Sequence, residues 1–398
     1  PAGQVAFMVT GDAAEAAAYE TLVAAFARAQ PAARVELRHV PGQNEFRTRL
    51  VSDLAAGAPA DVVLLNYRRY AEFAAGNAFV PVDRFLARSS VLRAADFYPD
   101  ALRPFYWDGA LVGVPQNLSS LVVYFNKSLF DRAGVAHPKD DWTWEGFLAA
   151  AVALTRAAER DGGVDSYGLG TEATLYRAAP FVWQNGGELA TGANRPNGLA
   201  LGHPAALDAI QWFVDLQVKH RVVPDAAAEQ AERSEQRFLN GRTAMFLNSR
   251  RGVPTYRGVP SLDWDVAALP RGKRRAGILH ADAYFLTAMS RSKDVAWALV
   301  EYANSVAGQA VVAATGRTVP SLKTVSRSDA FLDPTTRPRN SKAFLEAIPH
   351  LRAVPVMERW NDIEAILDEE IARAFYGRAS TAEVIVAAER RSSQLFHL

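Results

Sequence analysis

Two apolar runs, residues 5–9 and 61–65, are each followed at once by polar residues. The first run leads into Thr10, Gly11 and Asp12, and the second leads into Asn66, Tyr67, Arg68 and Arg69. In a parallel α/β sheet, ligands bind outside the carboxyl ends of the strands, which is where these side chains would lie. Carboxylate, amide, phenol and guanidinium groups can hydrogen-bond a ligand without making or breaking a covalent bond. The two turns therefore predict a binding site.

A third polar stretch, Gln116-Asn117-Leu118-Ser119-Ser120, follows the turn Gly113-Val114-Pro115. It carries no charge and runs into a β-branched and aromatic segment, residues 121–125, that predicts a strand. Its amide and hydroxyl groups are neutral hydrogen-bond donors and acceptors, so this stretch is a further candidate for ligand contact.

The composition is that of an ordinary globular protein. The chain has 398 residues, enough for two domains, and is 49% hydrophobic and 22% charged. Its net charge of +1 gives no basic excess that would favour nucleic acid as a partner. It contains no cysteine, which excludes a disulfide framework, and the spacing of its 7 histidines does not fit a metal site. We therefore predict no cofactor and no metal.

Alternating strands and helices over the first 65 residues predict a doubly wound parallel sheet. The strands are residues 5–9, 35–40 and 61–65, and the helix after the first strand presents Tyr19, Leu22, Val23 and Phe26 on one stripe. The later elements are predicted as helices at 144–160, 207–218, 294–305, 307–314, 358–375 and 381–395, and as strands at 166–170 and 283–287. Thr143 is the predicted N-cap of the first of these helices. The run 264–269, stopped by Pro270, predicts a strand that returns to the first domain.

The order of features from Gly113 to Thr155 resembles that of the extracytoplasmic solute-binding proteins of carbohydrate ABC importers, in the sugar-binding branch that includes maltose-binding proteins. Later patterns extend the resemblance over nearly the whole chain: WQNGGE at 183–188, FLNGRTAMF at 238–246 and GRTVP at 316–320. The resemblance implies an α/β fold of two lobes, each a doubly wound sheet flanked by helices, joined by three hinge crossings near Gln116, Pro270 and Pro320. The implied division is 1–115 plus 265–318 for the N-terminal lobe and 116–264 plus 319–398 for the C-terminal lobe.

The resemblance also implies ligand-binding positions in a cleft between the lobes. These are Asp12, Asn66, Tyr67, Arg68, Gln116, Asn117, Ser119, Trp183, Asn248, Ser249, Asp282, Tyr284 and Arg317. For several of them a structural role competes: Trp183 could stack on a sugar ring or lie in the core, and Arg317 could contact ligand or form a hinge salt bridge. Arg250 and Arg251 could be surface cations, so Asn248 and Ser249 are preferred in that turn.

The stretch Leu279 to Tyr284 departs from the family, which usually has a glycine-rich turn there. Asp282 could place a carboxylate in the cleft, which would hold sugar hydroxyls or an ammonium group and repel phosphate. The ligand predicted is a sugar, either neutral or bearing an amine. A glycerophosphodiester or phosphorylated polyol stays open because guanidinium groups at Arg68-Arg69 and Arg250-Arg251 suit phosphate.

The alternative from another class is a glycosidase, which needs two carboxylates held across a cleft. The acidic run Asp368-Glu369-Glu370 lies mid-helix on an expected solvated face, and no nucleophile elbow or phosphate loop is present. We therefore predict binding without catalysis, by hinge closure, and delivery to ABC permease subunits outside the cytoplasm. No run of about 18 apolar residues could span a membrane, which leaves open a lipid anchor on an N-terminal cysteine outside this sequence. A monomer is expected.

Overall fold

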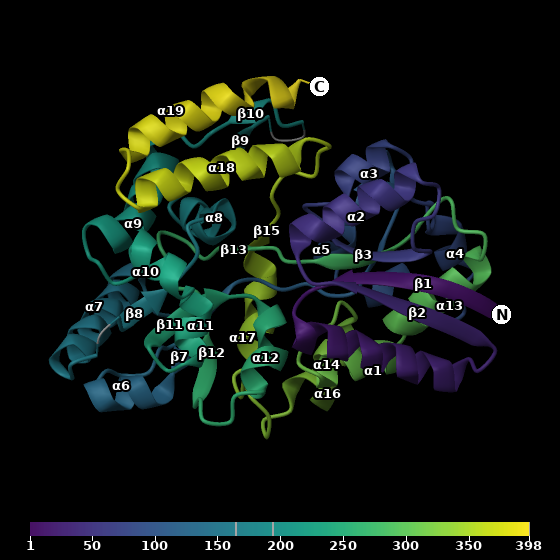
Figure 1. Ribbon diagram of the computed structural model, residues 1–398, viewed down its shortest axis with the longest axis horizontal. Helices are drawn as coiled ribbons and strands as arrows, with labels where there is room; N and C mark the ends of the chain where they lie inside the picture. The colour runs from purple at the N-terminus through teal and green to yellow at the C-terminus, as the bar shows by residue number, and fades with distance from the viewer. Residues whose placement is uncertain (164, 193–194, 398) are drawn as a thin grey trace.

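The computed structural model describes residues 1–163, 165–192 and 195–397. Two sheets organise this part of the chain, and Figure 1 shows them in separate halves of the molecule, each with its own helices. We call the half built on the five-stranded sheet the first lobe and the half built on the four-stranded sheet the second lobe.

The first lobe contains the predicted βαβαβ unit. Its sheet has the strand order β2 (Ala33–Val40), β1 (Gly3–Thr10), β3 (Val62–Asn66), β14 (Asp282–Leu286), β6 (Val114–Pro115). β1 is parallel to β2 and β3, as predicted, whereas β14 is antiparallel to β3. The helices α1 (Ala13–Ala29) and α2 (Gln43–Ala55) connect these strands, and α13 (Lys293–Asn304) and α14 (Val306–Ala314) pack against α1.

The predicted apolar stripe of α1 is its buried face. Tyr19, Leu22 and Phe26 are completely buried. Asp12 caps the helix by accepting a hydrogen bond from the backbone N–H of Glu15, and the Glu15 side chain returns a bond to the N–H of Asp12. This capping box fixes where α1 begins and places both carboxylates at the carboxyl end of β1.

The second lobe is built on a mixed sheet with the order β12 (Trp264–Ala267), β7 (Val122–Asn126), β11 (Thr243–Asn248), β8 (Tyr167–Gly170). Only the β11–β8 pair is parallel. The sheet and its surroundings are covered by α7 (Trp144–Arg160), α8 (Leu175–Gln184), α9 (Pro204–Val218), α18 (Trp360–Phe375) and α19 (Thr381–Ser392). The N-cap of α7 is Thr143, as predicted.

One strand assignment from the sequence is wrong. Residues 264–269 were expected to return the chain to the first lobe, but β12 pairs antiparallel with β7 in the second sheet. The hydrophobic pattern identified the strand and could not identify its partner, because any buried strand shows the same continuous apolar run. The chain passes to the first sheet only after β12.

Three segments lie side by side between the lobes. Asn117 forms an isolated antiparallel bridge with Pro320, and Ser119 forms one with His280. These pairings bring together the predicted crossings near Gln116 and Pro320 with the start of β14. The number of hinge crossings and the residue ranges of the two lobes stay predictions.

The remaining elements are short. They are α3 (Ala71–Ala75), α4 (Asp83–Arg88), α5 (Pro99–Leu102), β4 (Tyr106–Trp107), β5 (Ala110–Leu111), α6 (Lys127–Ala133), β9 (Ala190–Thr191), β10 (Gly198–Leu199), α10 (Ala226–Ala231), α11 (Ser234–Leu239), α12 (Val253–Arg257), β13 (Gly277–Ile278), α15 (Lys323–Ser326), α16 (Asp329–Leu332), α17 (Lys342–Ala347) and β15 (Leu351–Arg352). In the part of the chain that the structure describes, none of the helices has the length and apolar character needed to cross a membrane.

Candidate functional site

Asp282 lies at the centre of the polar contacts between the segments that join the lobes. Its Oδ1 accepts a hydrogen bond from Asn66 Nδ2 at 3.1 Å, and its Oδ2 accepts one from Asn117 Nδ2 at 3.4 Å. Arg317 Nη2 is 3.6 Å from the same Oδ2. Burial alone would raise the pKa of Asp282, but His280, Arg317 and the two amide hydrogen bonds lower it below its ordinary value. Asp282 is therefore a carboxylate whose two oxygens are engaged by three separate segments.

Gln116 and Tyr284 form a buried hydrogen-bonded chain behind Asp282. The Tyr284 hydroxyl donates to Gln116 Oε1 at 2.7 Å, and Gln116 Nε2 donates to the hydroxyl oxygen of Tyr19 at 3.1 Å. All three side chains are buried. These hydrogen bonds fix the orientation of the first crossing against α1 and β14. Gln116 and Tyr284, both predicted as ligand-binding residues, therefore support the site from within the first lobe.

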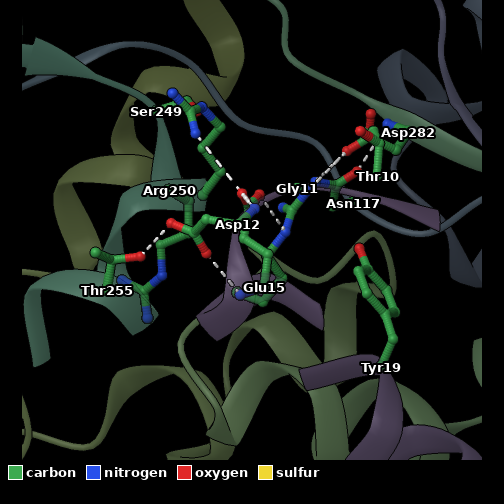
Figure 2. A network of polar contacts seen from close by, with 12 residues as sticks. Thr10, Gly11, Asp12, Glu15, Tyr19, Asn117, Ser249, Arg250, Thr255 and Asp282 are labelled. Atoms are coloured by element: carbon green, nitrogen blue, oxygen red, sulfur yellow. Dashed lines mark hydrogen bonds and ion pairs between the residues drawn. The ribbon is translucent and has the colours of Figure 1, made fainter. Parts of the chain in front are cut away.

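The capping box of α1 meets the second lobe (Figure 2). Asp12 Oδ2 accepts a hydrogen bond from Thr255 Oγ1 at 2.5 Å. Glu15 is paired on one side with Arg317, Nε to Oε1 at 3.1 Å, and on the other with Arg251, Nη1 to Oε2 at 3.7 Å. Arg317 therefore forms the salt bridge that competed with ligand contact in the sequence interpretation.

Asn248 and Ser249 shape the turn that carries Arg251. Asn248 Nδ2 donates to the Tyr256 hydroxyl at 2.8 Å, and the carbonyl of Ser249 accepts from the Tyr124 hydroxyl at 2.6 Å. Burial would lower the pKa of Arg251, but Glu15 and Glu235 raise it above its usual value, so the guanidinium stays charged. Arg251 is thus a cation that joins the lobes, although the sequence analysis preferred Asn248 and Ser249 in this turn.

A second contact between the lobes is made by Arg68 and Arg69. Arg68 donates to Glu364 on α18, and Arg69 Nη2 is 3.1 Å from the same Glu364 oxygen. The Arg68 guanidinium also lies 4.4 Å from the centroid of the Tyr176 ring on α8. Tyr67 points elsewhere: it is fully buried, and its hydroxyl accepts a hydrogen bond from the N–H of Val354 at 3.1 Å.

Two predicted residues have no side-chain contact with this group. The Ser119 hydroxyl donates to the carbonyl of Ser120, although the Ser119 backbone is bridged to His280. Trp183 is only 2% exposed, and the Arg352 guanidinium lies 5.2 Å from its ring centroid. Stacking of Trp183 on a ligand stays a prediction, and it would require Arg352 to move.

We call the region where the two lobes meet, around Asp282, Glu15 and Arg68, the seam. Some buried polar groups around the seam have no hydrogen-bond partner within the described residues. They include the hydroxyls of Thr171 and Tyr176 and the Nη1 of Arg317. A buried donor left without a partner is costly, so such groups in a native protein call for an explanation. Tyr176 lies in this region, because its ring centroid is 4.4 Å from the Arg68 guanidinium and 6.3 Å from that of His280. Burial raises the pKa of Tyr176 to about 12.

Sequence reasoning missed Glu15, Tyr176, Arg251, Thr255 and Glu364 as partners in the seam. Glu15 could have been found, since a Glu three residues after an N-cap Asp is the capping-box spacing. The others depend on how α8, α12 and α18 pack, which no local pattern in the sequence reveals.

A small cavity of about 40 Å³ lies away from these residues. It is lined by Ser120 to Val122, the connection between β12 and β13, and α17, and none of the predicted ligand-binding residues lines it. Among the described residues, no group of His, Asp and Glu side chains has the arrangement of a metal site.

Comparisons with known proteins give a consistent result. A family model described as "Bacterial extracellular solute-binding protein" matches residues 10–310. A putative binding protein of Brucella abortus (strain 2308) is 24% identical over 409 residues, which cover 99% of this chain and 93% of the relative.

Solved structures of similar proteins share the fold. An ABC substrate-binding protein from Listeria monocytogenes in complex with cycloalternan has a TM-score of 0.91 at 21% identity, with 100% of both chains covered. The GacH receptor of Streptomyces glaucescens, solved unliganded and with acarbose, has a TM-score of 0.87 at 21% identity, with 100% of this chain and 99% of that chain covered. A maltose-bound protein from T. maritima has a TM-score of 0.84 at 20% identity, with 98% and 99% covered. At these identities the likeness shows the two-lobed α/β fold.

Proposed function

Because this chain belongs to the bacterial extracellular solute-binding proteins, we propose that it captures a carbohydrate between its two lobes and delivers it to the permease of an ABC importer. The family and the similar structures are binding proteins, so the glycosidase alternative is set aside. The proposed lobes are 1–115 with 268–318 and 116–267 with 319–398, which moves β12 from the first lobe of the predicted division to the second lobe. The protein acts outside the cytoplasm, either free or held by a lipid anchor.

The observation that carries the proposal is the convergence of polar groups from both lobes. Asp12 follows β1, Asn66 ends β3 and Asp282 begins the antiparallel β14, while Tyr176 and Arg251 contact this region from the second lobe. The unpartnered donors of Thr171, Tyr176 and Arg317 would gain partners from a ligand rich in oxygen. A sugar offers many hydroxyls that can accept and donate at once. Support for a carbohydrate also comes from the similar structures, which were solved with cycloalternan, acarbose and maltose.

The charges of the seam favour an uncharged ligand. Arg68 faces Glu364, Arg177 faces Glu172, and Arg251 and Arg317 both face Glu15, each within 4.0 Å. Because each of these guanidinium groups is already paired with a carboxylate, a phosphodiester would gain less from them than from unpaired cations. An ammonium group would likewise compete with Arg317 and two amides for Asp282. We therefore place a neutral, hydroxyl-rich sugar ahead of an amino sugar and of a glycerophosphodiester.

A thermal-shift screen tests this proposal. Neutral mono- and oligosaccharides, amino sugars and glycerophosphodiesters are added in turn, because a ligand that binds only the folded state must raise the melting temperature. We expect neutral saccharides to give the largest increase. If phosphodiesters alone raise it, the ligand class is wrong while the binding function stands.

The Tyr176 hydroxyl provides the matched test of the site. We expect Tyr176→Phe to weaken binding of the best ligand by about 1 kcal/mol in calorimetry, because one buried hydrogen bond to the ligand is lost. Tyr106→Phe is the control, since the Tyr106 side chain is 47% exposed on the first lobe. Equal affinity of the Tyr176 variant and the parent would place the ligand elsewhere.

A further inference from the structure

The N-terminus of α1 has more polar groups than the helix needs. A capping box requires one oxygen from the N-cap residue and one from the residue three positions on. Asp12 Oδ1 accepts from the N–H of Glu15 at 2.9 Å, and Glu15 Oε2 accepts from the N–H of Asp12 at 2.9 Å. The cap is complete with these two bonds, so Asp12 Oδ2 and Glu15 Oε1 are left for other partners.

Both carboxylates also make contacts outside α1. Asp12 Oδ2 accepts from Thr255 Oγ1 at 2.5 Å, and Glu15 Oε2 faces Arg251 Nη1 at 3.7 Å. Thr255 lies on α12, and Arg251 lies in the turn between β11 and α12. Val253 and Tyr256 lie near Thr255 on α12. Both are buried, and they pack with strands of the second sheet. Both bonds therefore join the first lobe to the second.

Glu15 also connects this contact to the hinge. Its Oε1 is 3.1 Å from Arg317 Nε, and Arg317 Nη2 reaches Asp282 at 3.6 Å. Figure 2 shows the resulting row of polar contacts from Asp282 past Glu15 to Thr255. Glu15 is held in place because it is only 2% exposed.

The contacts to the second lobe are placed where they can break. Asp12 is exposed and Thr255 is half-buried, so water can replace their bond when the lobes separate. One third of the Arg251 side chain is exposed, which lets it keep solvent contact in either arrangement. The cap bonds within α1 would survive such a separation unchanged.

We propose that the capping box of α1 is an interlobe latch, in which Asp12 and Glu15 bind Thr255 and Arg251 and so keep closed molecules populated before any ligand arrives. The latch raises ligand affinity through the population of closed molecules, because the apparent dissociation constant falls as the binding-competent fraction rises. It requires that the lobes move relative to each other and does not depend on which solute is bound.

Distance measurements between two spin labels test the latch in ligand-free protein. The chain has no cysteine, so Val51→Cys and Val386→Cys give a single labelled pair without background. Val51 on α2 is 48% exposed and Val386 on α19 is 63% exposed, which places one label on each lobe. The latch variants are Thr255→Val and Arg251→Gln, both of which leave the capping box intact.

Matched controls are available in α1 and α2. Thr21→Val removes a hydroxyl that donates only to Ala17 within α1, and Arg49→Gln removes a cation that pairs with Asp53 within α2. We expect Thr255→Val to lower the ratio of closed to open molecules about tenfold, the effect of losing a hydrogen bond to a charged group. Arg251→Gln is expected to lower it less, and the controls are expected to match the parent.

Three results would overturn the latch. One is a ligand-free parent protein in which no measured distance between the two labels corresponds to the closed arrangement. Another is a distance distribution that Thr255→Val and Arg251→Gln leave unchanged. The third is a change of equal size in the controls. Since no ligand is added, none of these results bears on the proposed solute, and failure of the ligand screen would leave the latch standing.

Discussion

At the scale of single residues, the burial of Trp183 argues for a role in stability. Its side chain is 2% exposed within α8, and Arg352 covers its ring. We expect Trp183→Ala to lower the free energy of unfolding by about 3–5 kcal/mol, the usual cost of removing a large buried aromatic side chain. Denaturant unfolding measures this loss. Calorimetry with the best ligand tests the predicted stacking: lost affinity would support it, whereas unchanged affinity with lowered stability would mean that Trp183 serves only the core.

Asp368 on α18 gives the protein a pH dependence of known sign. Burial and the neighbouring Glu364 raise the pKa of Asp368 to about 7, although the N–H of Leu175 donates to its Oδ1 at 2.8 Å. The unfolded carboxyl has a pKa of about 3.9. Between these values the folded state binds one proton more than the unfolded state, so Asp368 makes stability fall as pH rises from about 4 to about 7.

The variant Asp368→Asn isolates this effect, because it keeps an acceptor for Leu175 and cannot titrate. We expect the difference in unfolding free energy between variant and parent to grow by up to roughly 1.4 kcal/mol per pH unit across that window and to level off above it. Denaturant unfolding at a series of pH values measures the difference. A difference that does not vary with pH would contradict the prediction.

The residues that the sequence could identify are those fixed by local rules. Asp12 and Asn66 were predicted as ligand-binding residues because each follows or ends a strand whose hydrophobic run is visible in the sequence, and the structure places both where the lobes meet. Asp282 lies beside Asn66 because it begins β14, which runs antiparallel to β3. Ligand contact by these residues stays a prediction. Tyr176 and Glu364 were not predicted. Each sits within a helix like any other polar residue, and only the packing of α8 and α18 against the first lobe gives it a partner.

At the scale of elements, too, features fixed by local sequence were predicted correctly and features fixed by long-range packing were not. The helix α7 begins and ends where its N-cap and periodicity predicted, whereas β12 was assigned to the wrong sheet. Caps and periodicity act over a few residues, so one sequence can reveal them. Strand pairing is decided by contacts far along the chain, since β12 pairs with β7 more than a hundred residues earlier.

Gly316 ends α14 at the point where the chain turns toward the third predicted crossing. Its φ is 90°, and a Cβ there would lie 2.6 Å from Val253 Cγ1. We expect Gly316→Ala to destabilise the fold by about 1–2 kcal/mol for the left-handed backbone and by about 1–3 kcal/mol more for the clash. Denaturant unfolding provides the measurement. Gly57→Ala is the control, because Gly57 has a φ of 71° and nothing within 4 Å of its Cβ position. Equal losses of unfolding free energy in the two variants would mean that Val253 on α12 can move aside for the added methyl group without measurable cost.

At the scale of the whole molecule, two of the charged contacts between the lobes lie on separate elements. One joins the capping box of α1 to Thr255 and Arg251, and the other joins Arg68 and Arg69 to Glu364 on α18. The predicted hinge segments lie beside Asp282, which bonds to Asn117 and Arg317. Closure therefore depends on charged groups at both contacts, so weakening either one should shift the whole molecule toward the open arrangement.

Glu364 is the most exacting test of this view, because it is 3% exposed and serves two arginines at once. Burial raises its pKa, but Arg68 and Arg69 together lower it below its usual value, so it is charged when the lobes are closed. In Glu364→Gln, the two guanidinium groups would lose the buried carboxylate that they share. Loss of one partner from a buried ion pair costs about 3–5 kcal/mol, and separating the lobes lets water take the place of that partner.

We therefore expect Glu364→Gln to increase the radius of gyration of the ligand-free protein in small-angle X-ray scattering. The control is Glu346→Gln, whose carboxylate is 59% exposed and pairs with Lys342 on the same helix. Added ligand should return the variant toward the parent dimensions, since binding between the lobes favours the closed arrangement. If the variant keeps the parent's dimensions and unfolds with less free energy, Glu364 stabilises α18 and does not control closure.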